Sequence, residues 1–143
     1  MRKIVPVLLI LLLVPAGYYM TLSDEESTGK QNLQNDNGVS LELDKVTYSP
    51  GDTMVITLIN NASTNATASY HFKLYKLEGK AWKEVPVNLM FIEIAVVIEP
   101  GKSWEQKVDL SRLNLEPGHY KIVKEVYLEG TTVKAEAEFD IRE

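Results

Sequence analysis

The chain has 143 residues, of which 45% are hydrophobic, and its 20 acidic and 15 basic residues give a net charge of −5. An acidic chain whose basic residues are scattered is not expected to bind nucleic acid. The chain has no cysteine, which excludes a disulfide framework, a thiolate metal site and lipid attachment to an N-terminal cysteine.

Residues 1–20 are predicted to direct export. Arg2 and Lys3 precede an apolar run that carries no charge before Asp24, as in a secretory signal peptide. The run from Ile4 to Leu22 also approaches the roughly 20 residues that span a bilayer. The sequence therefore leaves two outcomes open, secretion after cleavage or retention by a single N-terminal membrane helix, and both place the following residues outside the cytoplasm.

Residues 21–37 are polar, rich in turn-forming residues and nearly free of large apolar side chains. Such a segment cannot bury enough apolar surface to order itself. We therefore expect a flexible linker between the N-terminal segment and a single domain at residues 38–143.

Within residues 38–143 the apolar residues recur with period two, and Gly, Pro and Asn clusters interrupt them at the spacing of short strands. Strands are predicted over 39–43, 54–59, 70–75, 89–98, 104–108, 120–128 and 132–141, with a helical turn over 109–113. In the second of these, Met54, Ile56 and Leu58 form the inward face. No helix of ordinary length is expected.

The segment 89–98 is almost continuously apolar. One of its two alternating faces consists of Met90, Ile92, Ile94, Val96 and Ile98, and the other contains Glu93. A charged residue is rarely buried without a partner, so we expect the first face to point into the core. The strand is a candidate for contact with a partner by strand addition, and a central buried strand would explain the same apolar run.

The segment Leu115-Glu-Pro-Gly-His-Tyr120 predicts a turn that leads into a strand opening with a tyrosine. In immunoglobulin-like sandwiches a tyrosine at this corner returns its hydroxyl to upstream backbone, and the residue two positions later faces the core. Tyr120 and Ile122 hold these positions. The expected fold is an all-β, immunoglobulin-like antiparallel β-sandwich of about seven strands.

Two sets of surface residues are candidates for function. Phe91, Val97 and Trp104 would form an apolar partner-binding patch if alternation places them on one outer surface. Asn61 and Asn65 each begin an Asn-x-Ser/Thr sequence in a polar loop, which is a glycosylation acceptor in hosts that use it and a chance match in hosts that do not.

No catalytic residue, cofactor site or metal site is expected. The two histidines, His71 and His119, have no nucleophile beside them in the sequence, whereas a hydrolase needs a nucleophile, a base and a group that orients the base. Both histidines are interpreted as surface residues.

A family of bacterial immunoglobulin-like domains in small exported proteins resembles this chain in the order and spacing of several motifs. These include Tyr48-Ser-Pro-Gly-Asp52, Gly79-x-x-Trp82, Glu99-Pro-Gly101 and Leu115-x-Pro-Gly-x-Tyr120. The resemblance covers essentially residues 38–142 and implies a binding or structural module without naming a ligand. Many members are lipoproteins, and this chain differs from them in having no cysteine.

A weaker resemblance is to proteinase inhibitors of the BsuPI type, which share the Gly-x-x-Trp hairpin and the Pro-Gly-x-Tyr corner. The sequence therefore predicts a non-catalytic extracytoplasmic interaction or structural module, with a protein partner at the cell surface. The alternative is an inhibitor of the same fold.

Overall fold

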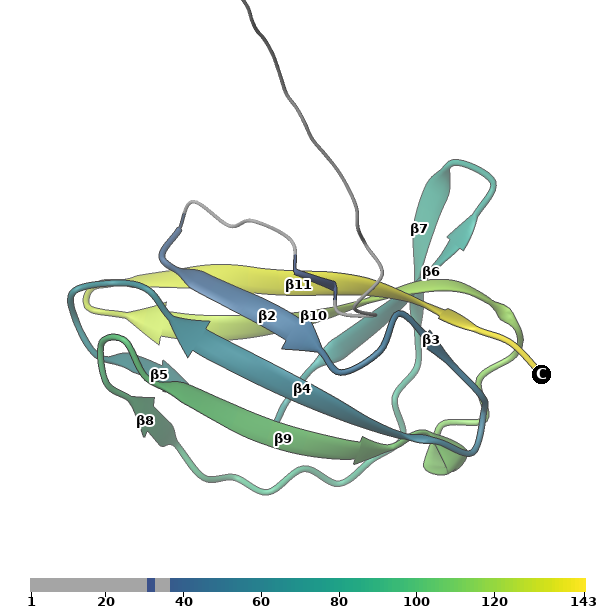
Figure 1. The fold of residues 1–143 in the computed structure, drawn as a ribbon, viewed down its shortest axis with the longest axis horizontal. Coiled ribbons are helices and arrows are strands. Elements are labelled where there is room, and N and C mark those ends of the chain that lie inside the picture. The colour runs from purple at the N-terminus through teal and green to yellow at the C-terminus, as the bar shows by residue number, and fades with distance from the viewer. Residues whose placement is uncertain (1–30, 33–36) are drawn as a thin grey trace, which may run out of the picture. The chain divides into compact units, whose positions relative to one another are not determined.

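Two β-sheets face one another in the computed structural model, which describes residues 31–32 and 37–143 (Figure 1). The first sheet has the strand order β1 (Gln31–Asn32), β2 (Val39–Leu43), β4 (Thr53–Asn60) and β9 (Ser103–Asp109). The second has the order β3 (Thr47–Tyr48), β11 (Thr131–Ile141), β10 (Gly118–Leu128), β5 (Ala66–Ala68) and β8 (Val96–Ile98). In the second sheet β6 (Lys73–Glu78) also pairs with β10, and β7 (Ala81–Val85) pairs with β6.

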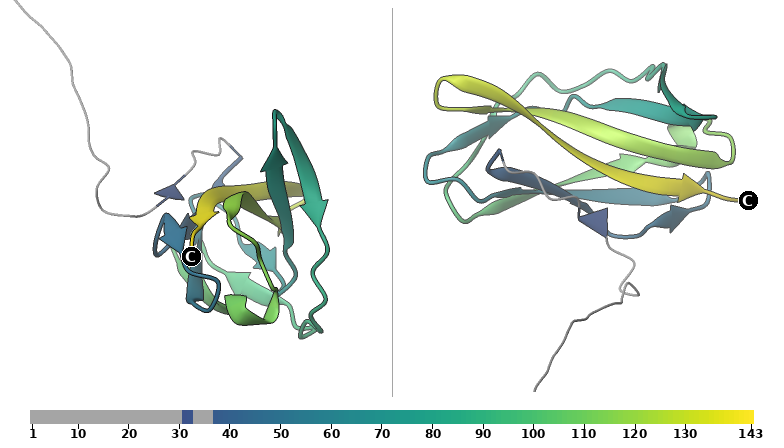
Figure 2. Two further views of the ribbon diagram at one scale, coloured as in Figure 1. Left: turned by 90° about the vertical axis from the view of Figure 1, so that its right-hand side faces the viewer. Right: turned by 90° about the horizontal axis from the view of Figure 1, so that it is seen from above.

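All strand pairs are antiparallel except β3 with β11, which are parallel. The β6–β7 hairpin extends beyond the two facing sheets (Figure 2). A short 3-10 helix at Leu110–Arg112 follows β9 and confirms the predicted helical turn. The predicted immunoglobulin-like all-β sandwich is confirmed.

Alternating side chains of both sheets form the core. Met54, Ile56 and Leu58 of β4 are buried, as their period-two spacing predicts. They face a layer from β10 and β11 in which the rings of Tyr120 and Phe139 stack with centroids 5.6 Å apart. Period-two burial on two facing sheets is the packing of a β-sandwich.

Two buried tyrosines, Tyr48 and Tyr120, pack on Phe139 at one end of the core. The Tyr120 hydroxyl donates a hydrogen bond to the Glu116 carbonyl oxygen at 2.6 Å, the geometry of a tyrosine corner, and Ile122 is fully buried. The Tyr48 hydroxyl donates to Asp44 Oδ1 at 2.6 Å. Burial, followed by this hydrogen bond, raises the pKa of Tyr48, so its phenol stays protonated.

The prediction for residues 89–98 is wrong in extent and, except at Val96 and Ile98, in which side chains face the core. Only Val96–Ile98 is a strand, and residues 86–95 form a long connection between β7 and β8. Met90, Ile92 and Ile94, predicted to face the core, are 98%, 53% and 54% exposed. Both faces of this segment are apolar, so hydrophobic period could not decide which one turns inward.

Two residues of the predicted linker take part in the first sheet. Gln31 and Asn32 pair with Leu43 and Glu42 of β2. Such pairing uses backbone groups and needs no apolar side chain, which is why composition did not indicate it. The predicted export segment 1–20 lies outside the described residues. In the part of the chain that the structure describes, no helix has the length and hydropathy needed to cross a membrane.

Candidate functional site

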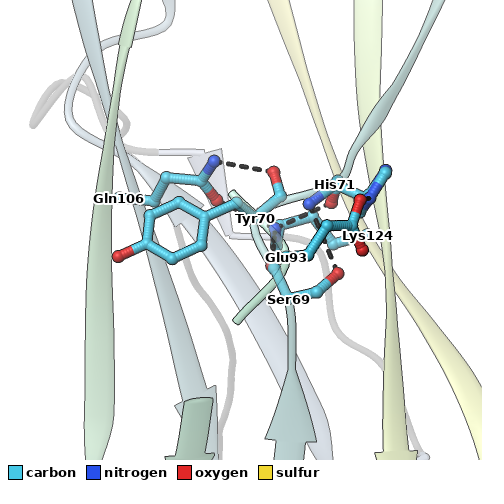
Figure 3. Close-up of polar contacts among 6 residues, drawn as sticks. All are labelled: Ser69, Tyr70, His71, Glu93, Gln106 and Lys124. Carbon is cyan, nitrogen blue, oxygen red and sulfur yellow. Dashed lines mark hydrogen bonds and ion pairs between the residues drawn. The ribbon is translucent and has the colours of Figure 1, made fainter. Parts of the chain in front are cut away.

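A buried lysine organises the middle of the second sheet. Lys124 lies on β10 between the inward residues Ile122 and Val126 and is only 1% exposed. Its ammonium group donates to the carbonyl oxygens of Ser69 (2.7 Å) and His71 (2.9 Å), and to Gln106 Oε1 (2.8 Å). Three acceptors match the three N–H donors of an ammonium group. Figure 3 shows Lys124 beside Ser69 and His71, from the connection between β5 and β6, and Gln106 of β9.

Lys124 lies opposite an interruption between β5 and β6, the two strands that pair with the same edge of β10. β5 pairs with β10 up to Thr67–Tyr127, and β6 resumes at Lys73–Val123, so residues 68–72 lie opposite residues 124–126. Because residues 68–72 outnumber the residues opposite them, they form a bulge. The Ser69 and His71 carbonyl groups of this bulge point toward Lys124. Gln106 of β9 completes the link, since its Nε2 donates to the Tyr70 carbonyl oxygen at 2.8 Å.

Burial lowers the pKa of Lys124 to about 8. Lowered lysine pKa values are often a sign of catalytic function. Here the ammonium group is buried and its three donors are already bonded to protein oxygens, and its Nζ lies 5.4 Å from the Trp104 ring. The arrangement therefore indicates a structural cross-link between the two sheets.

The bulge in turn anchors the connection between β7 and β8. His71 Nε2 lies 2.9 Å from Glu93 Oε2, and the rings of His71 and Phe72 lie 4.7 and 5.1 Å from the ring of Phe91. Val87, Leu89 and Phe91 pack against the core. We call residues 86–95 the anchored loop: one alternating set of its side chains is held, and the other set, which includes Met90 and Ile92, is exposed.

Two hollows adjoin on the outer face of the second sheet, because Ser69 and Glu125 line both. The first, of about 380 Å³, has Lys73 and Lys134 on its wall. The second, of about 430 Å³, lies beside the anchored loop. We call the two together the outer-face groove.

Strand register places a row of residues across the outer face at the second hollow, and three of them, Thr67, Tyr127 and Thr132, line it. Thr132 pairs with Tyr127, Tyr127 with Thr67, and Thr67 with Val97. Paired residues on adjacent strands point to the same face, so this row crosses four strands on the outer side. Tyr127 and Val97 are 52% and 58% exposed. The exposed apolar side chains of Tyr127 and Val97, together with exposed Ile94 in the wall of the second hollow, are the kind of surface that marks an interaction site.

The structure divides the three residues of the predicted partner patch. Val97 and Trp104 line a separate shallow hollow of about 330 Å³ between β8 and β9. Trp104 is half-buried, with its ring 5.1 Å from that of Tyr70. Phe91 is held against Phe72 and contributes to anchoring the loop. Of the three, Val97 is exposed (58%), whereas Phe91 and Trp104 are partly buried.

The two glycosylation candidates lie in the loop between β4 and β5. Asn61 and Asn65 are both exposed, and the Asn61 side-chain nitrogen donates to Ser40 Oγ at 3.0 Å. Exposure makes both amides accessible, and glycosylation stays a prediction for each.

His119 lies between two carboxylates on the outer end of β10. Its Nδ1 is 2.6 Å from Asp140 Oδ1 and its Nε2 is 2.6 Å from Glu138 Oε1. The two carboxylates bind opposite nitrogens of the ring, so they cannot converge with it on one metal ion. Residues 31–32 and 37–143 hold no group of three or more His, Asp or Glu side chains arranged to bind a metal. Both histidine rings contact carboxylates, His71 that of Glu93 and His119 those of Asp140 and Glu138.

This pairing predicts a pH-dependent stability. The hydrogen bonds to Asp140 and then to Glu138 raise the pKa of His119 above 6.5, because the charged imidazole donates from both nitrogens. The stabilisation is fully present below pH 6.5 and is lost as the pH rises through the raised pKa. We expect the free energy of unfolding of the wild type to fall relative to that of His119→Gln over this window. An NMR titration of the ring that gave a pKa at or below 6.5 would contradict the prediction.

Sequence reasoning missed Lys124, Gln106 and the groove. Lys124 did carry a signal, since it continues the inward period of Tyr120, Ile122 and Val126. A charged residue at an inward position requires partners. The outer-face groove carried no such signal, because the bulge and the anchored loop that shape it come from distant segments.

No curated protein matches the chain. Among solved structures it is similar to the alkylpurine DNA glycosylase AlkC of Pseudomonas fluorescens bound to DNA containing an abasic site analog. The identity is 14%, the TM-score is 0.41, and the match covers 76% of this chain and 32% of that one. It is also similar to the soluble domain of PmoD from Methylocystis sp., with 10% identity and a TM-score of 0.39, over 79% of this chain and 89% of that one. A third similar structure is a mutant beta-glucosidase from Listeria innocua in complex with laminaribiose, with 12% identity and a TM-score of 0.36, over 73% of this chain and 16% of that one.

The chain thus spans about a third of the glycosylase and less of the glucosidase. The family model described as bacterial Ig-like domain matches residues 35–140, which are the residues of both sheets from β2 almost to the end of β11. The chain therefore belongs to the bacterial Ig-like domain family.

Proposed function

We propose that this domain is a non-catalytic protein-binding module that acts outside the cytoplasm. The observation that carries the proposal is the exposure of apolar side chains on the anchored loop and on the adjoining sheet face: Met90, Ile92, Ile94, Val97 and Tyr127. Exposing several large apolar groups near one another is unfavourable unless a partner covers them. The export pattern of residues 1–20 supports the location, either secreted or held at the membrane by the N-terminal segment.

The backbone of the anchored loop adds to this support. Residues 86–95 belong to no strand, and β8 pairs with β5 along one edge. An extended segment with unpaired backbone groups and an open strand edge can accept a strand from another protein. Anchoring by Val87, Leu89 and Phe91 keeps this segment ordered, so less entropy is lost when a partner binds.

The test is capture of a partner from an envelope extract of the host by the tagged full chain. We expect a captured protein to be lost when Ile92, Ile94 and Tyr127 are replaced by serine. The matched control is Val46→Ser, which changes an exposed apolar residue (36% exposed) next to β3, at the opposite edge of the same sheet from β8. Equal capture by the wild type and the triple variant, or no capture by either, would argue against binding at this face and for a structural role.

Proteinase inhibition is the second candidate. Met90 is 98% exposed while its neighbours Leu89 and Phe91 are packed against the core, so one side chain projects from a segment fixed on both sides. Such a segment has the form needed to enter a protease cleft. The test is to measure the activity of a panel of proteases in the presence of the full chain. The absence of inhibition at micromolar concentration would contradict the inhibitor function.

A further inference from the structure

Charge is unevenly distributed along the outer-face groove, with Glu93 only in the hollow beside the anchored loop, two lysines only in the adjoining hollow, and Glu125 shared by both. The charged residues that line the hollow beside the anchored loop are Glu93 and Glu125, among the apolar or neutral side chains of Ile94, Ala95 and Tyr127. The adjoining hollow shares Glu125 but adds Lys73 and Lys134. A partner that lies over the loop end therefore meets negative charge on an apolar floor.

From this charge pattern we infer that the loop end of the groove binds an extended segment of a partner protein in which a lysine or arginine stands next to apolar residues. The inference rests on the proposed function and specifies the chemistry of its partner. The long side chains of lysine and arginine can lay their methylene groups along Tyr127 and Ile94 while the charged head meets Glu93 and Glu125. An acidic segment would meet like charge at the same place.

The anchored loop fixes one of the two carboxylates. Glu93 Oε2 is held 2.9 Å from His71 Nε2, whose ring packs on Phe91. A carboxylate has about four acceptor positions, so this bond leaves Glu93 able to accept from a partner. Glu125 comes from β10, where it pairs in register with Lys134. The acidic site thus combines Glu93 of the loop with Glu125 of the sheet. The position of Glu93 depends on His71 in the bulge, and Lys124 stabilises that bulge.

The experiment measures binding of two fluorescently labelled peptides to the full chain by fluorescence polarisation. One peptide alternates valine and lysine, and the other alternates valine and glutamate. We expect saturable binding of the lysine peptide that weakens as salt is added, and much weaker binding of the glutamate peptide. Equal binding of the two peptides, or no binding of the lysine peptide, would overturn the inference.

Variants locate the site. The double change Glu93→Gln and Glu125→Gln should lower the affinity for the lysine peptide by about three- to tenfold, as expected for two partly exposed charge pairs. The matched control is Lys73→Gln with Lys134→Gln in the adjoining hollow, which should leave the affinity unchanged or raise it. An unchanged affinity in the glutamate-to-glutamine variant would overturn the inference.

The two proposals can fail separately. If the host partner is captured equally well by the wild type and by the Glu93→Gln, Glu125→Gln variant, while the serine triple variant loses it, the binding module stands and the basic segment is wrong. If the lysine peptide binds with the expected charge dependence but no host partner depends on Ile92, Ile94 and Tyr127, the groove chemistry stands and the cellular role is wrong.

Discussion

Lys124→Met should lower the free energy of unfolding by about 3 kcal/mol, within the range measured when one partner of a buried polar network is removed. Methionine matches the length of the lysine stem but leaves the Ser69 and His71 carbonyl oxygens and Gln106 Oε1 without their donor. Orphaned buried acceptors cost about 1–3 kcal/mol each, less where water can reach them. Chemical denaturation of the full chain measures the effect.

The control is Lys107→Met, which removes an exposed lysine of β9 next to Gln106 and should change stability by less than about 0.5 kcal/mol. A second readout is pH dependence. Because the pKa of Lys124 is lowered from 10.5 to about 8, the unfolded chain binds a proton that the folded chain lacks between these values. Wild-type stability should therefore rise relative to Lys124→Met from pH 8 to 10.5. Equal stability of wild type and variant at neutral pH, together with parallel pH profiles, would contradict the structural role.

Asn60→Ala should cost a similar amount, about 3 kcal/mol, because Asn60 is fully buried and each of its side-chain bonds satisfies a backbone group. Its Nδ2 donates to the carbonyl oxygens of Thr64 (2.9 Å) and Ile98 (2.8 Å), and its Oδ1 accepts from the Ala62 amide at 2.9 Å. Asn60 therefore joins β4 of the first sheet to β8 of the second.

The effect should be local as well as global. We expect faster amide hydrogen exchange at Val96–Ile98 in Asn60→Ala, since loss of the Ile98 contact frees β8 at the sheet edge. Asn65→Ala, an exposed change in the same loop, should leave both exchange and stability near those of the wild type. Unchanged exchange at β8 in Asn60→Ala would show that the two sheets are held together at this end by other contacts.

The pattern of Tyr120 and Ile122 was readable from the sequence because it depends on neighbours along the chain. The Pro-Gly turn sets the start of β10, and the period of two then decides which side chains face inward. The same reasoning placed Met54, Ile56 and Leu58 correctly. Local turn chemistry and alternation were enough for the fold class and for most strands.

The conformation of the anchored loop could not be predicted, because it depends on residues distant in the sequence. Residues 89–94 are apolar on both alternating faces except at Glu93, so either face could have been buried. The structure packs Leu89 and Phe91 against the core, and the ring of Phe91 contacts His71 and Phe72, which the bulge brings there. Glu93 is exposed for the predicted reason, yet its neighbours Ile92 and Ile94 are exposed with it.

The sequence by itself determined the all-β sandwich, its tyrosine corner and its family, since turns, alternation and motif order are properties of consecutive residues. The tertiary structure alone decided the pairing of Lys124 with Gln106, the placement of His119 between Asp140 and Glu138, and the groove between Glu93 and Glu125. Each of these joins residues from different strands or loops, and their meeting depends on strand register and on one bulge. Neither is encoded in the hydrophobic period of any single segment.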